Sequence, residues 1–159
     1  MRLAIGPTVD TNGRAGVEAT VSLGLGTPLD FSHRSHHYMQ ALGAIGGGLD
    51  GNTGSREFLA RADVSYIYWM LPRLDLRTGA GYSYREVGSG TGLRRWNAVG
   101  GHFGLMPVVY ERKSNWIPIQ VAVGAEMRVD WLFDEKTSNV HSLFSFPVIA
   151  EVNFLAAGD

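Results

Sequence analysis

The feature that most constrains this chain is a strict alternation over residues 117–131. Odd-numbered positions from Ile117 to Trp131 are apolar, whereas even-numbered positions are small, polar or charged and include Glu126 and Arg128. A period of two is typical of a β-strand, because successive side chains leave the backbone on opposite sides. At about 3.3 Å per residue the segment would be about 50 Å long, far beyond the roughly five or six residues of most strands. Tilted by about 45°, it predicts a strand that crosses the apolar band of an outer membrane.

The same alternation recurs along the chain, and connections rich in Gly, Asn and Asp separate the alternating segments. The predicted strands span residues 2–10, 14–26, 38–49, 58–70, 74–84, 96–110, 117–131 and 141–155. An even number of strands joined by short turns favours an antiparallel meander. Closing the meander removes both exposed edges. We therefore expect one all-β domain over residues 1–159, a closed up-and-down transmembrane β-barrel of about eight strands.

Composition excludes several other classes of protein. A net charge of −1, with no basic helix and no zinc-finger spacing, argues against a nucleic-acid partner. The absence of cysteine excludes disulfides and thiolate metal sites, and we predict no cofactor. No run of 18 consecutive apolar residues is present, so we expect no transmembrane helix. A barrel is then the remaining way to satisfy backbone polar groups in lipid.

The chain opens Met-Arg-Leu-Ala-Ile-Gly-Pro, which lacks the basic start, apolar run and cleavage site of a signal peptide. For an envelope protein this would mean a mature form that carries an added Met1. We expect an outer-membrane location, with the signal peptide not present in this chain.

Alternation alone does not say which face lies inside, because a soluble lipocalin-like barrel gives the same pattern with its faces reversed. The polar face consists largely of Gly, Ser, Ala and Thr, with a few charges of both signs. The only lysines, Lys113 and Lys136, fall in predicted turns. Such a set fits a crowded lumen better than a hydrated exterior rich in Lys and Glu. We therefore predict that the apolar face meets lipid.

The ionisable residues of the polar face predict a lumen cross-linked by ion pairs. Buried charges are costly unless they are paired, and arginine offers a forked donor for carboxylates. Eight strands enclose an interior that side chains can just fill, so we expect no open water channel. The predicted network comprises Glu18, Arg61, Asp63, Asp75, Arg77, Arg85, Glu126, Arg128, Asp130 and Glu151.

All four tryptophans fall at or near predicted strand ends, where membrane barrels carry aromatic girdles. The alternative is that large sheet-forming residues simply cap the core of a soluble barrel. We predict membrane-interface positions for Trp69, Trp96, Trp116 and Trp131.

The alternating strands, the inward Arg/Asp/Glu set and the aromatic last strand Phe144-Ser145-Phe146-Pro147-Val148-Ile149-Ala150-Glu151-Val152-Asn153-Phe154 resemble the small eight-stranded outer-membrane barrels of the OmpA and OmpX type, over nearly the whole chain. The resemblance implies a location, with a structural, anchoring or partner-binding role among outer-membrane lipids, more than an activity. Those families usually finish on an aromatic residue, whereas residues 155–159 follow Phe154 here. A narrow pore and a soluble lipocalin-like ligand-binding barrel stay open as alternatives.

Nucleophilic catalysis is a further hypothesis, because small barrels resembling lipid A deacylases use a serine and a histidine. His141 and Ser142 are adjacent, so alternation sends them to opposite faces. His141 and Ser145 share a face but lie two strand repeats apart, too far for direct contact. We therefore predict that the chain is not an enzyme, and replacement of His102 and His141 would test this.

Two surface features suggest partners. His33, His36 and His37 share one connection, but only Asp30 is a nearby carboxylate, so we predict no metal site and a docking surface for another protein as the second interpretation. Basic residues in or beside the connections of one rim could contact lipopolysaccharide phosphates, or be merely solvated. They are Arg14, Arg56, Arg94, Arg95 and Lys136.

Overall fold

The computed structural model describes residues 1–29, 36–51, 53–71, 73–89, 92–112, 119–134 and 139–154. Its strands are β1 (Arg2–Asp10), β2 (Ala15–Pro28), β3 (His37–Asp50), β4 (Arg56–Leu71), β5 (Leu74–Ser89), β6 (Gly92–Arg112), β7 (Ile119–Asp134), β8 (Val140–Ser145) and β9 (Val148–Phe154). Within these ranges there is no helix long and apolar enough to cross a bilayer.

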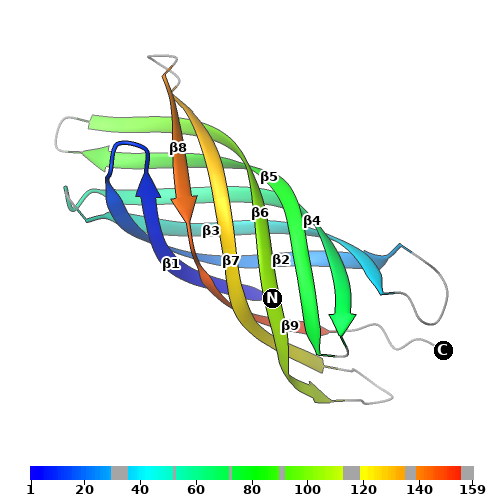
Figure 1. The fold of residues 1–159 in the computed structure, drawn as a ribbon. Coiled ribbons are helices and arrows are strands. Elements are labelled where there is room, and N and C mark those ends of the chain that lie inside the picture. The colour runs from blue at the N-terminus through cyan, green and yellow to red at the C-terminus, as the bar shows by residue number, and fades with distance from the viewer. Residues whose placement is uncertain are drawn as a thin grey trace.

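The strands form a closed antiparallel ring (Figure 1). Each strand from β1 to β7 pairs with the next one along the chain. Both β8 and β9 pair with β7 on one side and with β1 on the other, so they share a single position in the ring. The described strands therefore build an eight-stranded up-and-down barrel, and the predicted fold class is confirmed.

The eighth position is interrupted between β8 and β9, where the sequence predicts one continuous strand. Pro147 has no backbone N–H to offer a neighbouring strand. The chain compensates with two bonds outside the regular ladder: Phe146 N donates to Pro7 O at 3.1 Å, and Glu126 N donates to Pro147 O at 3.0 Å. The continuous strand predicted over residues 141–155 is therefore wrong at its centre, and residue 155 lies outside the described ranges.

Several strands extend further than their hydrophobic pattern. We predicted that β5 ends at Tyr84 and that β6 begins at Trp96, but the two strands stay paired as far as Ser89 and Gly92. Both faces of this extension carry polar or charged residues, so the alternation of hydrophobicity stops before the hydrogen-bond ladder does. Hydrophobic patterning therefore marked the apolar band and not the full strand.

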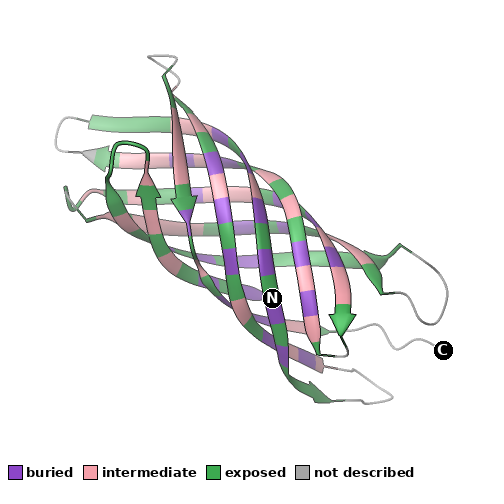
Figure 2. Cartoon of the chain, viewed as in Figure 1, coloured by how far each residue is buried: buried purple, intermediate pink, exposed green. Residues whose placement is uncertain are grey.

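The barrel has an apolar exterior and a polar interior. Along β7, exposed Val123 and Met127 alternate with buried Glu126, Arg128 and Asp130. Figure 2 shows buried and more exposed positions following one another along the strands. Among the described residues, 17 polar or charged residues are buried against 10 hydrophobic ones. A soluble barrel has the reverse arrangement, because it hides apolar side chains from water. The lipocalin-like alternative is therefore contradicted.

The two mouths of the barrel differ in what surrounds them (Figure 1). We call the end at which β1 begins and β9 ends, and which also carries the β2–β3, β4–β5 and β6–β7 connections, the terminal end. The opposite end carries the β1–β2, β3–β4, β5–β6 and β7–β8 connections.

Candidate functional site

An ion-pair network crosses the lumen. Its centre is Arg85, whose side chain is fully buried. One terminal nitrogen of Arg85 lies 2.9 Å from Glu18 and 3.2 Å from Asp130, and the other lies 2.7 Å from Glu57. We call the continuous set the central network, and its members are Glu18, Glu57, Arg61, Asp63, Arg85, Arg128 and Asp130.

The remaining links tie further strands into the central network. The Arg128 guanidinium lies 2.8 Å from Asp130 and 2.9 Å from Asp63, so it links these two carboxylates. Arg61 contacts Glu18 at 3.2 Å and Asp130 at 3.3 Å. These side chains come from β2, β4, β5 and β7, so the pairs reach across the lumen. Arginine suits this role, because one planar guanidinium serves several carboxylate oxygens at once.

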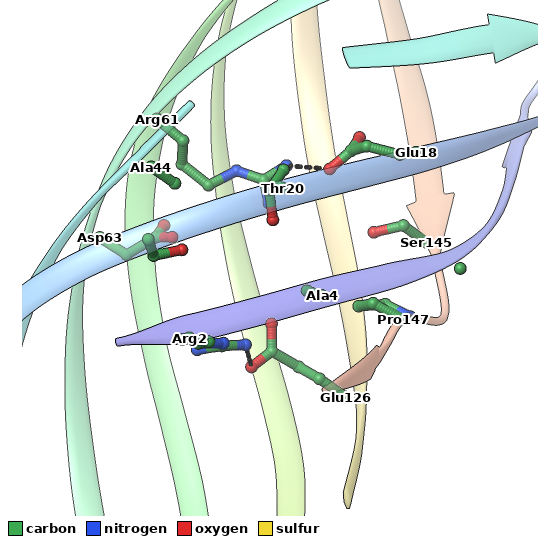
Figure 3. Close-up of a pocket in the computed structure, with 12 residues that line it drawn as sticks. Arg2, Ala4, Glu18, Thr20, Ala44, Arg61, Asp63, Glu126, Ser145 and Pro147 are labelled. Carbon is green, nitrogen blue, oxygen red and sulfur yellow. Dashed lines mark hydrogen bonds and ion pairs between the residues drawn. The ribbon is translucent and has the colours of Figure 1, made fainter. Parts of the chain in front are cut away.

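Other ion pairs lie outside the central network. Arg2 on β1 contacts Glu126 on β7 at 2.5 Å (Figure 3). Near the terminal end, Arg77 on β5 contacts Asp75 at 3.4 Å and also pairs with Glu151 on β9. All three carboxylates and both arginines are buried. Unpaired, each would carry a desolvation penalty of several kcal/mol.

Each of the ten residues that we predicted for the lumen takes part in one of these ion pairs. The sequence analysis missed two further members, Arg2 and Glu57. Arg2 is the first residue of the predicted strand over residues 2–10, and Glu57 lies one residue before the predicted strand over residues 58–70. Both have the inward parity of their strands, so extending the alternation to the strand ends would have found them.

Apolar side chains also fill part of the lumen. Met106 and Val108 of β6 pack with Ala122 of β7, Ile149 of β9 and Ala4 of β1. The cavity drawn in Figure 3, which lies beside the Arg2–Glu126 pair, measures only about 20 Å³. A cavity of that size holds about one water molecule.

A serine and a histidine meet inside the barrel. Ser65 Oγ on β4 lies 2.9 Å from His102 Nε2 on β6, and His102 Nδ1 has no partner in the described part of the chain. Gly79 of β5 lies between them in register and has no side chain to separate them. A base within reach of a hydroxyl is the arrangement that activates a nucleophile. Both residues are buried, since Ser65 is 1% exposed and His102 is 5% exposed.

The sequence alone did not indicate this pair, because the serines that we compared with a histidine were those close to His141 in the chain. Alternation shows which residues of one strand share a face. It does not show which residues make contact when a third strand lies between their two strands. The signal lies in the register, which sets Ser65 opposite Gly79 and Gly79 opposite His102.

The tryptophans do not form one girdle. Trp69 has the inward parity of β4 and contacts Tyr38 at 4.7 Å between ring centroids, near the terminal end. Trp96 has the inward parity of β6 and meets the His141 ring edge-on at 5.4 Å near the opposite end. Trp131 faces outward and is 47% exposed, whereas Trp116 lies outside the described ranges. Trp69 and Trp96 therefore differ from the predicted interface position, because a place near a strand end does not fix the side of the sheet.

The histidine-rich connection is described only in part, because His33 lies outside the described ranges. His37 stacks on Tyr66 and Tyr68, with ring centroids 5.9 and 5.1 Å away. His37 Nδ1 also lies 2.5 Å from the Tyr66 hydroxyl. Across the described ranges, no three His, Cys, Asp or Glu side chains are grouped to hold a metal ion.

The predicted basic rim divides into two sets at the opposite end. Arg14 and Arg94 line a recess of about 240 Å³ in the mouth of the barrel. Arg56 and Arg95 have outward parity, and exposed Arg95 lies 3.2 Å from Glu86. Lys136 lies outside the described ranges.

No protein-family model and no curated protein sequence matches this chain. Solved structures match it in fold. The outer membrane enzyme PagL superposes with a TM-score of 0.64 at 9% identity, covering 94% of this chain and 97% of PagL. Neisserial surface protein A (NspA) superposes with a TM-score of 0.62 at 14% identity, covering 94% of this chain and 92% of NspA.

These identities are too low to transfer an activity, and they show the fold alone. One prediction is nevertheless contradicted. We expected that the chain is not an enzyme, but PagL is an outer membrane enzyme built on this fold, so the barrel architecture gives no ground for excluding catalysis. The predicted resemblance is confirmed: the chain has the fold of the small outer-membrane β-barrels.

Proposed function

We propose that this chain is an outer-membrane barrel with a closed, charge-paired lumen, which serves as a rigid membrane anchor for contacts made at its rim. The observation that carries this proposal is the central network, which reaches across the lumen. Together with the separate pairs of Arg2 and Arg77, it gives every buried arginine of the described residues a carboxylate partner. The apolar cluster around Met106 and Ile149 supports the same conclusion, because it fills another part of the interior. Cross-linked strands of this kind give a stiff wall and no water-filled path.

The purified protein, refolded in detergent, is expected to show no steady open level in planar-bilayer recordings. A heat-dependent shift in gel migration checks that the barrel is folded. Arg61→Ser is the comparison variant, because it shortens a side chain beside the cavity while Arg85 still holds Glu18 and Asp130. We expect brief conductance events in this variant.

A steady open level in the unsubstituted protein would overturn the closed lumen and favour the narrow pore. A protein that stays monomeric without detergent and shows no heat-dependent shift would overturn the membrane placement itself.

We further propose that the outward side of the opposite end contacts lipopolysaccharide phosphates. The surface concerned, the outer rim patch, consists of Arg56, Tyr82, Tyr84, Glu86, Arg95 and Asn97. Hydrogen bonds within the outer rim patch hold some of its side chains in place: the Tyr84 hydroxyl donates to Glu86 at 2.5 Å, and the Tyr82 hydroxyl donates to Asn97. Guanidinium groups next to amphipathic aromatics at the membrane surface suit a phosphorylated lipid headgroup.

The Arg56→Gln, Arg95→Gln double variant is expected to retain less lipopolysaccharide than the unsubstituted protein in a pull-down from mixed micelles. Losing two guanidinium–phosphate contacts should weaken binding about tenfold or more. Arg112→Gln is the matched control, because Arg112 ends β6 at the terminal end. Equal retention by the double variant and the control would remove the lipopolysaccharide assignment.

A protein partner at the His33–His37 connection stays a prediction. Only His36 and His37 belong to the described residues there. Its place at the terminal end would put such a partner on the side of the membrane that carries the chain termini.

A further inference from the structure

The recess in the mouth of the opposite end is distinct from both the packed lumen and the outer rim patch. Its volume is about 240 Å³, twelve times that of the interior cavity. The residues around it come from each strand from β1 to β8 and from the β1–β2 and β3–β4 turns. Glu57, a member of the central network, also lines it, so the network lies beneath the recess.

The acidic groups of the recess are already engaged. Asp10 accepts hydrogen bonds from the backbone N–H groups of Asn12 at 2.8 Å and Arg14 at 2.9 Å. Asp50 accepts one from Thr53 N at 3.0 Å, and Glu57 is held by Arg85. These carboxylates shape the turns and the floor of the recess.

The two arginines that line the recess differ from its carboxylates in the interactions that they make. Arg14 lines the recess from the β1–β2 turn, and Arg94 lines it from β6. Among the residues that the structure describes, neither takes part in an ion pair. Two guanidinium groups that line one concave site, beside carboxylates that already have donors, favour an anionic ligand.

Aromatic rings form another part of the lining of the recess. Trp96 lies against His141, and His141 Nδ1 lies 3.3 Å from Asn12 Nδ2, which fixes the imidazole beside the indole. Apolar Leu132 and Leu143 complete this wall. An indole face flanked by hydrogen-bonding groups suits a flat, hydroxylated ring better than a compact inorganic ion.

We propose that this recess binds an acidic monosaccharide unit, a sugar ring that carries a phosphate or carboxylate group. Arg14 and Arg94 pair with the anionic group, and Trp96 carries the ring. His141 and Asn12 supply hydrogen bonds to its hydroxyl groups. The recess is of monosaccharide size and opens at the opposite end, away from the chain termini.

The test is a calorimetric titration of the full chain, folded in detergent micelles, with glucose 6-phosphate and with glucuronate. Neutral glucose and inorganic phosphate serve as the two partial ligands. We expect both acidic sugars to bind, and each partial ligand to bind about tenfold more weakly or worse, because it satisfies only half of the site.

Arg94→Gln is expected to weaken binding of both acidic sugars about tenfold, and Arg14→Gln gives an independent second variant. Trp96→Leu should reduce the affinity for glucose 6-phosphate to that for inorganic phosphate. Arg112→Gln at the terminal end is the matched control and should bind normally. A retained heat-dependent gel shift shows that each variant is folded.

The absence of binding by both acidic sugars would overturn the proposal. Equal affinity for inorganic phosphate and glucose 6-phosphate would also overturn it, because the ring surface would then contribute nothing. Unchanged binding in folded Arg94→Gln and Arg14→Gln would place the ligand elsewhere.

Discussion

Replacing Arg85 by leucine is expected to lower the free energy of unfolding by about 3–5 kcal/mol. The fully buried guanidinium holds Glu18, Glu57 and Asp130, and its removal leaves Glu57 without a cation in the described part of the lumen. Glu18 and Asp130 keep Arg61 as a partner, which limits the loss. Urea unfolding in detergent micelles, followed by the heat-dependent gel shift, measures the change.

The matched control is Arg95→Leu, which removes the same side chain from an exposed pair with Glu86. Solvent screens that pair, so the expected change is at most about 1 kcal/mol. Replacing both Arg85 and Glu57 by leucine should recover part of the loss, because no carboxylate is then stranded. Equal effects of Arg85→Leu and Arg95→Leu would show that pairing in the lumen adds nothing beyond a surface ion pair.

Gly6→Ala is expected to destabilise the barrel by about 1–3 kcal/mol or more. A Cβ atom at position 6 would lie 2.4 Å from Pro147 Cα and 2.5 Å from Phe146 O. Both are backbone atoms, so no side-chain rotation relieves the clash. The wall must shift where β1 meets the interrupted eighth position, and the urea midpoint should fall accordingly.

Gly43→Ala provides the comparison, because a Cβ there meets no atom within 4 Å. Alanine loses less conformational freedom on folding than glycine, so this variant should be neutral or more stable by about 0.5–1 kcal/mol. If Gly6→Ala and Gly43→Ala unfold at the same urea concentration, the contact between Gly6 and Pro147 does not limit the fold.

Hydrophobic alternation was sufficient to predict the number of strands, their order and the side on which most residues lie. It succeeded because a lipid-facing exterior and a crowded interior impose opposite demands on neighbouring positions. Glu126, Arg128 and Asp130 could be assigned to the lumen for this reason alone. The same pattern carries no information beyond the apolar band, which is why the end of β5 was predicted too early and the start of β6 too late.

The partners within the lumen could not be predicted, because parity gives the side of a strand and not its height in the barrel. Arg128 reaches Asp63 from β7 to β4, and Ser65 reaches His102 across β5. Such contacts depend on the register of every intervening strand. The inward positions of Trp69 and Trp96 were missed for a related reason, since the sequence analysis considered their place along the strand before their side.

The barrel wall is irregular at Phe146 and Pro147, where the eighth strand position is interrupted between β8 and β9. β1 is held there by two short ladders, with three paired positions to β8 and four to β9, whereas β2 and β3 share thirteen. The first and last strands meet at this line, so the ring closes only when the whole chain is present. This line has seven paired positions, and the neighbouring β1–β2 ladder has eight. The cylinder is therefore not equivalent on all sides, because the line where the first and last strands meet has the fewest paired positions of any strand boundary in the described ring.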